Sequence, residues 1–145
     1  MKRITAILFA LFILASCNSQ KIYSDFDISY SRSGGFAPIY ENLLIKGYDA
    51  HYSFEGQGKK YNQDFKVSRE DLNRIKRTLF QNNFRKIQED HQKIYDHIST
   101  SVNVKKGPNE GNKTDASEIM PNYRKNWTNI TYVFQELISN NVKKQ

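Results

Sequence analysis

The residue with the clearest chemistry is Cys17, the single cysteine among 145 residues. Its thiolate is a nucleophile that can be modified covalently, and a single cysteine forms no disulfide within its own chain. Lys2 and Arg3 stand near the start of the sequence, and the apolar run Ile4–Ala15 follows them. That run is too short to span a bilayer, which needs about 20 residues. The pattern is typical of an export signal that ends beside a reactive thiol.

The stretch Leu14-Ala15-Ser16-Cys17 resembles the lipobox of bacterial lipoproteins. The resemblance implies that residues 1–16 are a signal peptide, that Cys17 carries the lipid, and that residues 17–25 form a polar tether. Multiple acyl chains give stable anchoring, and Asn18 after the cysteine favours the outer membrane. The alternative interpretations are a secretory signal with an accidental cysteine and an uncleaved membrane anchor.

Residues 26–145 have the length of one domain. Without Lys2 and Arg3, 20 basic residues remain against 15 acidic ones, a formal charge of +5. The basic residues are scattered along the sequence with acids between them, and they form no continuous stripe. This argues against a nucleic-acid partner. A mild attraction to anionic lipid head groups or to an acidic protein surface is the more economical use of the charge.

Apolar and polar residues alternate in the first half of this domain. Residues 26–32 predict a strand with Phe26, Ile28 and Tyr30 on one face, and residues 36–47, 47–56 and 61–67 predict further strands. Pro38 is expected at a sheet edge, at a bulge or at the start of its strand. We expect the following tyrosines to lie in the core or in cross-strand pairs: Tyr30, Tyr48 and Tyr52.

Two amphipathic helices are predicted in the second half. Ser68 is suited to cap the first helix, which ends at Asn82-Asn83, and its apolar stripe is Leu72, Ile75 and Leu79. The second helix follows Pro121. Its apolar stripe is Tyr123, Trp127, Ile130, Phe134 and Leu137.

The segment between the two helices predicts a hairpin. Residues 94–104 alternate, with Ile98, Val102 and Val104 on one face, and predict a long strand. Residues 105–113 predict a loop, and residues 114–120 a returning partner strand. The whole order predicts an α+β fold, in which two amphipathic helices pack on one face of an antiparallel sheet of about four to six strands.

Four residues suggest an enzyme as one alternative function. His51 and Asp49 would share a strand face, and His97 and Asp96 lie in the predicted long strand. Such groups can transfer protons. However, the sequence contains no nucleophile elbow, HExxH motif, phosphate-binding glycine loop or calcium loop. We therefore expect no catalytic residue, no metal site and no cofactor. A purely structural envelope lipoprotein is the other alternative.

The turn after the first strand is the candidate partner-binding site. Adjacent glycines at positions 34 and 35 predict a tight turn with positive φ, and the aromatic Phe36 follows them. A protruding turn of this kind can be recognised by another protein. The candidate partner-binding residues are Arg32, Gly34, Gly35 and Phe36.

Several segments together resemble one known family. Arg32–Ala37, the helix start Ser68–Leu72, the segment Tyr95–Ile98 and Pro121 before a last helix are similar to emfourin-type proteins. These are small α+β inhibitors of thermolysin-like metalloproteases. The resemblance spans most of residues 26–138 and implies that this chain binds and inhibits such a protease. The sequence thus predicts a lipid-anchored, non-enzymatic binding module of the cell envelope.

Overall fold

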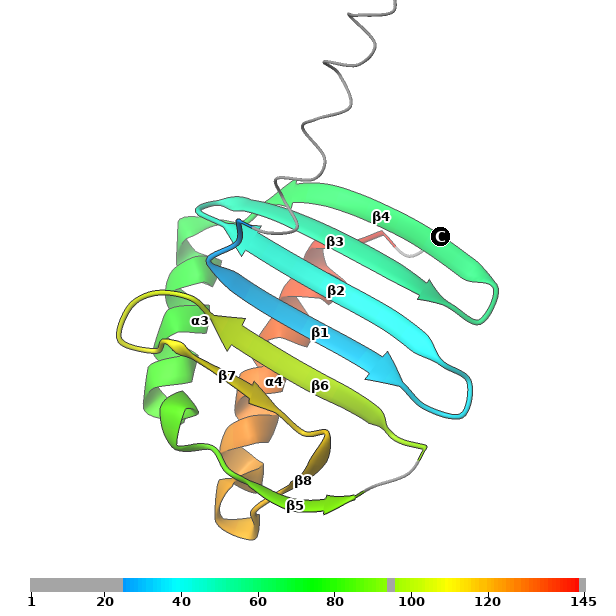
Figure 1. Cartoon of the computed structure of the whole chain (residues 1–145). Helices are drawn as coiled ribbons and strands as arrows, with labels where there is room; N and C mark the ends of the chain where they lie inside the picture. Colours follow the sequence, from blue (N-terminus) through cyan, green and yellow to red (C-terminus); the bar gives the residue numbers. More distant parts are fainter. Residues whose placement is uncertain (1–24, 94–95, 144–145) are drawn as a thin grey trace, which may run out of the picture.

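The structure is a computed structural model that describes residues 25–93 and 96–143. Cys17 and the predicted leader and most of the tether lie outside the described residues. The main element is a six-stranded sheet with the strand order β4-β3-β2-β1-β6-β7 (Figure 1). Its recorded neighbours all pair antiparallel. The strands are β1 (Ile28–Gly34), β2 (Ile39–Lys46), β3 (Asp49–Gly56), β4 (Lys59–Lys66), β6 (Ile98–Val104) and β7 (Gly111–Thr114).

Two α-helices lie against one face of the sheet (Figure 1). They are α3 (Arg69–Gln81) and α4 (Arg124–Asn141), and the short 3-10 helices η1 (Phe84–Lys86) and η2 (Pro121–Tyr123) adjoin them. The described core lies wholly between Ile28 and Val142. The predicted α+β fold, an antiparallel sheet with two helices on one face, is confirmed. We call the other sheet face the open face.

The alternation in β1 decides which face of the sheet is buried. Ile28 and Tyr30 are buried, and Tyr30 lies in register with Leu43 of β2 and Val102 of β6, which are also buried. Because side chains alternate along a strand, Ser29 and Ser31 belong to the open face. The strand prediction is confirmed, although β1 begins and ends two residues later than expected.

The tyrosine predictions are confirmed at two positions and wrong at one. Tyr30 and Tyr52 are buried in the core, but Tyr48 is 50% exposed. Tyr48 lies in the turn between β2 and β3, where its carbonyl accepts a hydrogen bond from the Val67 backbone amide at 2.8 Å. The strand expected from residue 47 therefore begins at Asp49, and Tyr48 belongs to the turn before it. Pro38 directly precedes β2, as predicted.

The first helix begins as its sequence predicts. Ser68 Oγ accepts a hydrogen bond from the Asp71 backbone amide at 3.0 Å, which satisfies one of the free amides at the helix start. Leu72, Ile75 and Leu79 are its buried residues. In α4 the predicted stripe is buried from Trp127 onward, so both amphipathic helices are confirmed.

The segment between the helices differs from its prediction. The long strand expected from residue 94 begins at Ile98, because Asp96 has φ +57° and interrupts the extended backbone; residues 94 and 95 lie outside the described ranges. The hairpin partner of β6 is β7, which lies in the expected loop except for Thr114. The expected returning strand instead pairs as β8 (Ser117–Ile119) with β5 (Glu89–Lys93) in a separate two-stranded sheet.

One carboxylate, Asp115, connects this segment to the helix layer. Its Oδ2 accepts a hydrogen bond from Trp127 Nε1 at 2.7 Å, and its Oδ1 accepts one from the Thr100 backbone amide. Its own amide donates to the Thr100 carbonyl at 3.0 Å, and its carbonyl accepts a bond from His97 Nε2 at 2.7 Å. Asp115 therefore fixes the positions of β6, the loop after β7 and α4 relative to one another.

Replacement of Asp115 tests this connection. Asp115→Ala should lower the free energy of unfolding by about 2 kcal/mol, because Trp127 Nε1 and the Thr100 amide lose their acceptor. Denaturant titration followed by tryptophan fluorescence measures the loss. Glu110→Ala is the matched control, since Glu110 is an exposed acid of the nearby loop and should cost less than about 0.5 kcal/mol. Equal losses in the two variants would contradict the assigned role.

Candidate functional site

The β1–β2 turn contains two residues with positive φ, and both are glycines. Gly34 and Gly35 have φ values of +99° and +90°, a region that side chains with a Cβ rarely adopt. Gly34 lies in register with Ile39 of β2 and with Ile98 of β6. The predicted tight turn with positive φ is thus confirmed, and it begins at the last residue of β1.

The two glycines also allow the turn to approach the start of β6 closely. A Cβ on Gly34 would lie 3.0 Å from the His97 carbonyl oxygen, and one on Gly35 would lie 3.1 Å from Ile98 Cγ1. The first neighbour is backbone and cannot rotate away. The glycines therefore permit the turn to lie against the start of β6, while Phe36 supplies a side chain that reaches solvent.

Phe36 is 92% exposed at this end of the sheet. Tyr40, on the following strand, and Ile98, in contact with the turn, are also exposed. Single exposed apolar residues are ordinary. The register places Tyr40 on the open face and Ile98 on the helix side, so Phe36, on the turn at this end of the sheet, is the main apolar group offered to a partner. We call Phe36, Tyr40 and Ile98 the turn surface.

Arg32 has a partner within the domain. Its Nη1 lies 3.1 Å from Glu41 Oε2, and Glu41 Oε1 accepts a hydrogen bond from Tyr52 Oη at 2.7 Å. Burial, followed by the bond to the Glu41 carboxylate, raises the pKa of Tyr52. Burial also raises the pKa of Tyr30 to about 12. The Arg32 guanidinium therefore neutralises a half-buried carboxylate instead of projecting beside Phe36.

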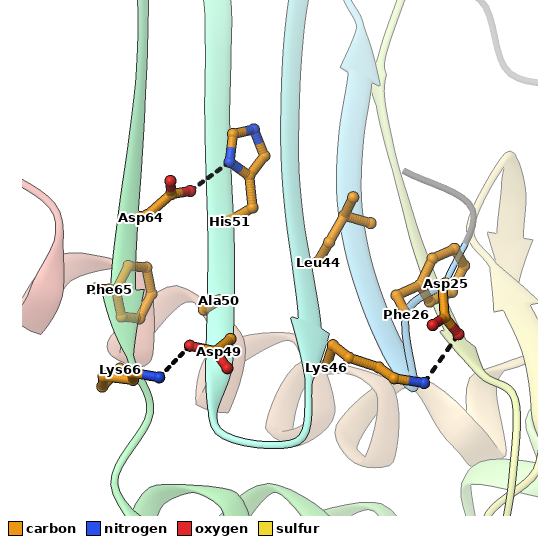
Figure 2. Close-up of a pocket in the computed structure, with 10 residues that line it drawn as sticks. All are labelled: Asp25, Phe26, Leu44, Lys46, Asp49, Ala50, His51, Asp64, Phe65 and Lys66. Atoms are coloured by element: carbon orange, nitrogen blue, oxygen red, sulfur yellow. Dashed lines mark hydrogen bonds and ion pairs between the residues drawn. The ribbon is translucent and has the colours of Figure 1, made fainter. Parts of the chain in front are cut away.

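A hollow of about 550 Å³ lies at the other end of the sheet, where the described chain begins (Figure 2). This volume is within the range of ligand pockets. Phe26 and Leu44 provide apolar lining, and Lys46 Nζ lies 2.8 Å from Asp25 Oδ1 at the rim. The hydrogen bond from Lys46 lowers the pKa of Asp25, and the same bond raises the pKa of Lys46.

Two further pairs of charged or polar side chains line the hollow, and each joins a residue of β3 to a residue of β4. His51 Nδ1 lies 2.6 Å from Asp64 Oδ1, and Lys66 is paired with Asp49 (Figure 2). The acids and bases around the hollow offset one another. The arrangement therefore offers an apolar floor with a polar rim and gives no strong preference for a charged ligand.

The four residues of the enzyme alternative do not form one site. His51 and Asp49 line the hollow, but His97 and Asp96 precede Ile98, which pairs with Gly34 at the other end of β1.

The sequence analysis did not identify the hollow. A signal was present in Leu43-Leu44: because neighbouring residues in a strand face opposite sides, one of these leucines had to lie on the open face.

No helix in the described part of the chain combines the length and apolar character needed to cross a membrane. The chain was compared with known families and with curated proteins, and it matches no family model and no curated sequence.

A pair of glycine variants tests why the turn needs glycine. Gly58→Ala should lower the free energy of unfolding by about 1 kcal/mol through its positive φ alone, since nothing lies within 4 Å of a Cβ at Gly58. Gly34→Ala should cost more, because the same methyl group also meets the His97 carbonyl. Denaturant titration of both variants gives the difference. A Gly34→Ala cost equal to or below that of Gly58→Ala would show that close approach does not matter.

Proposed function

We propose that this protein is a lipid-anchored binding module of the cell envelope, held at the outer membrane through Cys17 and free of catalytic activity of its own. The anchor is supported by the basic start, the short apolar run and the lipobox-like stretch that ends at Cys17. The binding role is supported by the turn surface. The partner is a protein, and the resemblance to emfourin-type proteins suggests a thermolysin-like metalloprotease.

The observation that carries the binding role is the exposure of Phe36 on a turn whose backbone is fixed. A phenyl ring that is 92% exposed in the free protein gains hydrophobic free energy when it enters an apolar pocket of a partner. Because Gly34 pairs with both β2 and β6, the backbone where the turn begins is already placed in the free protein, and this lowers the entropy lost on binding. A rigid turn with an aromatic tip can block a protease without supplying any reactive group.

Replacement of the cysteine tests the anchor. Cys17→Ser should prevent lipid attachment and release the protein from the membrane fraction, because serine lacks the thiolate that accepts the lipid. Metabolic labelling with a fatty acid, followed by membrane fractionation, measures both effects. A Cys17→Ser protein that still takes up label and matures to the same size would show that the anchor is misassigned.

An inhibition assay tests the binding role and its specific form. A fragment of residues 18–145 retains every described core residue and should inhibit a thermolysin-like protease. Phe36→Ala should weaken inhibition at least about tenfold, as expected when an aromatic anchor is truncated. Phe80→Ala is the matched control, because Phe80 is also an exposed aromatic residue (69%) but lies on α3, and it should leave inhibition unchanged.

Two results would contradict this proposal at different levels. A folded fragment that does not inhibit at micromolar concentration would exclude the inhibitor form. Equal losses from Phe36→Ala and Phe80→Ala would exclude the turn surface as the binding site, even where inhibition is observed.

A further inference from the structure

Several basic residues that are separated in the sequence lie on the exposed side of α3. Arg69, Lys76, Arg77 and Phe80 are spaced by seven, one and three residues and are all exposed. Such spacings place side chains on one side of a helix. The exposed Arg85 and Lys86 follow in and beside η1. We call these six residues, Arg69, Lys76, Arg77, Phe80, Arg85 and Lys86, the α3 patch.

Most of the charge of the α3 patch has no acidic neighbour in the sequence. Glu70 and Asp71 follow Arg69 in the first turn of α3, but the sequence from Leu72 to Gln88 contains no acidic residue. The ion pairs recorded among residues 25–93 and 96–143 include none of the five basic residues of the patch. Arg74, which lies between them in the sequence, instead pairs with Glu136 at 2.9 Å and with Asp71 at 3.2 Å.

The patch contains one large apolar group. Phe80 is 69% exposed although it belongs to a helix whose other apolar residues are buried. Because the apolar stripe of α3 is buried in the core, any membrane contact of this face rests on the attraction of its basic residues to anionic lipid, with Phe80 as the one large apolar group beside them. In such a contact the phenyl ring enters the head-group region, while each guanidinium or ammonium group contacts phosphate oxygens.

One residue of the α3 patch, Lys76, lies near the start of the described chain. Lys76 lines a cleft of about 250 Å³ together with Asp27 and Lys106, and the Lys76 carbonyl accepts a hydrogen bond from Asn109 Nδ2 at 3.0 Å. Asp27 is two residues from the first described residue. The seven residues 18–24 can span at most about 25 Å, and the 13 residues of α3 are about 20 Å long.

We propose that the α3 patch binds the anionic phospholipid head groups of a membrane surface. The location of that membrane rests on the proposed lipid anchor at Cys17, whose short tether would hold α3 within reach of the bilayer. The patch then acts as a second attachment beside the acyl chains and fixes which side of the domain faces the lipid. A row of basic residues on a helix suits a surface of phosphate groups. Each basic side chain can contact a phosphate group on its own, so no shaped pocket is needed.

Vesicle sedimentation of the non-lipidated fragment 18–145 tests the patch without the anchor. The fragment should bind vesicles that contain phosphatidylglycerol at low salt, lose this binding at high salt, and not bind vesicles of phosphatidylcholine alone. Arg77→Glu with Lys86→Glu should weaken binding roughly thirtyfold or more, since each basic residue near an anionic surface contributes about a factor of five. Phe80→Ala should weaken it less and make it more sensitive to salt.

The matched control is Lys59→Glu with Lys60→Glu. It makes the same change in net charge at the β3–β4 turn, far from α3 in the fold, and should retain most of the binding. Circular dichroism confirms that each variant is folded. Equal losses in the two double variants, or no binding of the folded fragment to phosphatidylglycerol vesicles at low salt, would overturn the proposal. The experiment is independent of lipidation, so failure of the Cys17 assignment and failure of the α3 patch can be distinguished.

Discussion

The stacking of Tyr30 on Phe134 lies at the centre of the contact between sheet and helices. The two rings are 5.2 Å apart at an interplanar angle of 12°, and they join β1, an inner strand, to the middle of α4. Because strand side chains alternate, the direction of Tyr30 fixes the buried face of β1, and the register passes this choice to β2 and β6. A shift by one residue would bury Ser29 and Ser31 and expose the core. The polar open face is therefore a consequence of the same contact.

This sheet also separates the two surfaces proposed to bind. β1 starts beside the hollow and the chain entry and ends at the turn surface. Seven strand residues cover about 23 Å, so an anchor at one end leaves the Phe36 turn well away from the membrane. The α3 patch lies on the helix side and the hollow on the open face. A domain resting on α3 would thus keep the turn surface accessible to a protein partner.

The parts of the fold that could be predicted are those in which local signals agree with burial. β1, β3 and β4 alternate clearly, and α3 has both a serine cap and a stripe at helical spacing. Apart from β6, which alternates, the segment from β5 to β8 lacks such agreement. β7 (Gly111–Thr114) contains no large apolar residue. It pairs with β6 in an antiparallel ladder, and Ser101 Oγ donates to Thr114 Oγ1 at 2.9 Å beside that ladder. Its place in the sheet depends on tertiary contacts that no short pattern encodes.

In the candidate sites, too, features set by adjacent residues could be predicted, and features set by residues that meet only in the fold could not. The glycine turn was visible because two adjacent glycines report a backbone requirement directly. The partner of Arg32 was not visible, since Glu41 reaches it through the pairing of β1 with β2. The formal charge of +5 gave no location for a basic surface by itself, although the stretch from Leu72 to Gln88 contains five basic residues and no acidic one. In the fold, several acids are paired across strands at the hollow, while α3 gathers arginines and lysines on one side. The distribution of charge, rather than its sum, is what gives the helix layer an unbalanced positive surface.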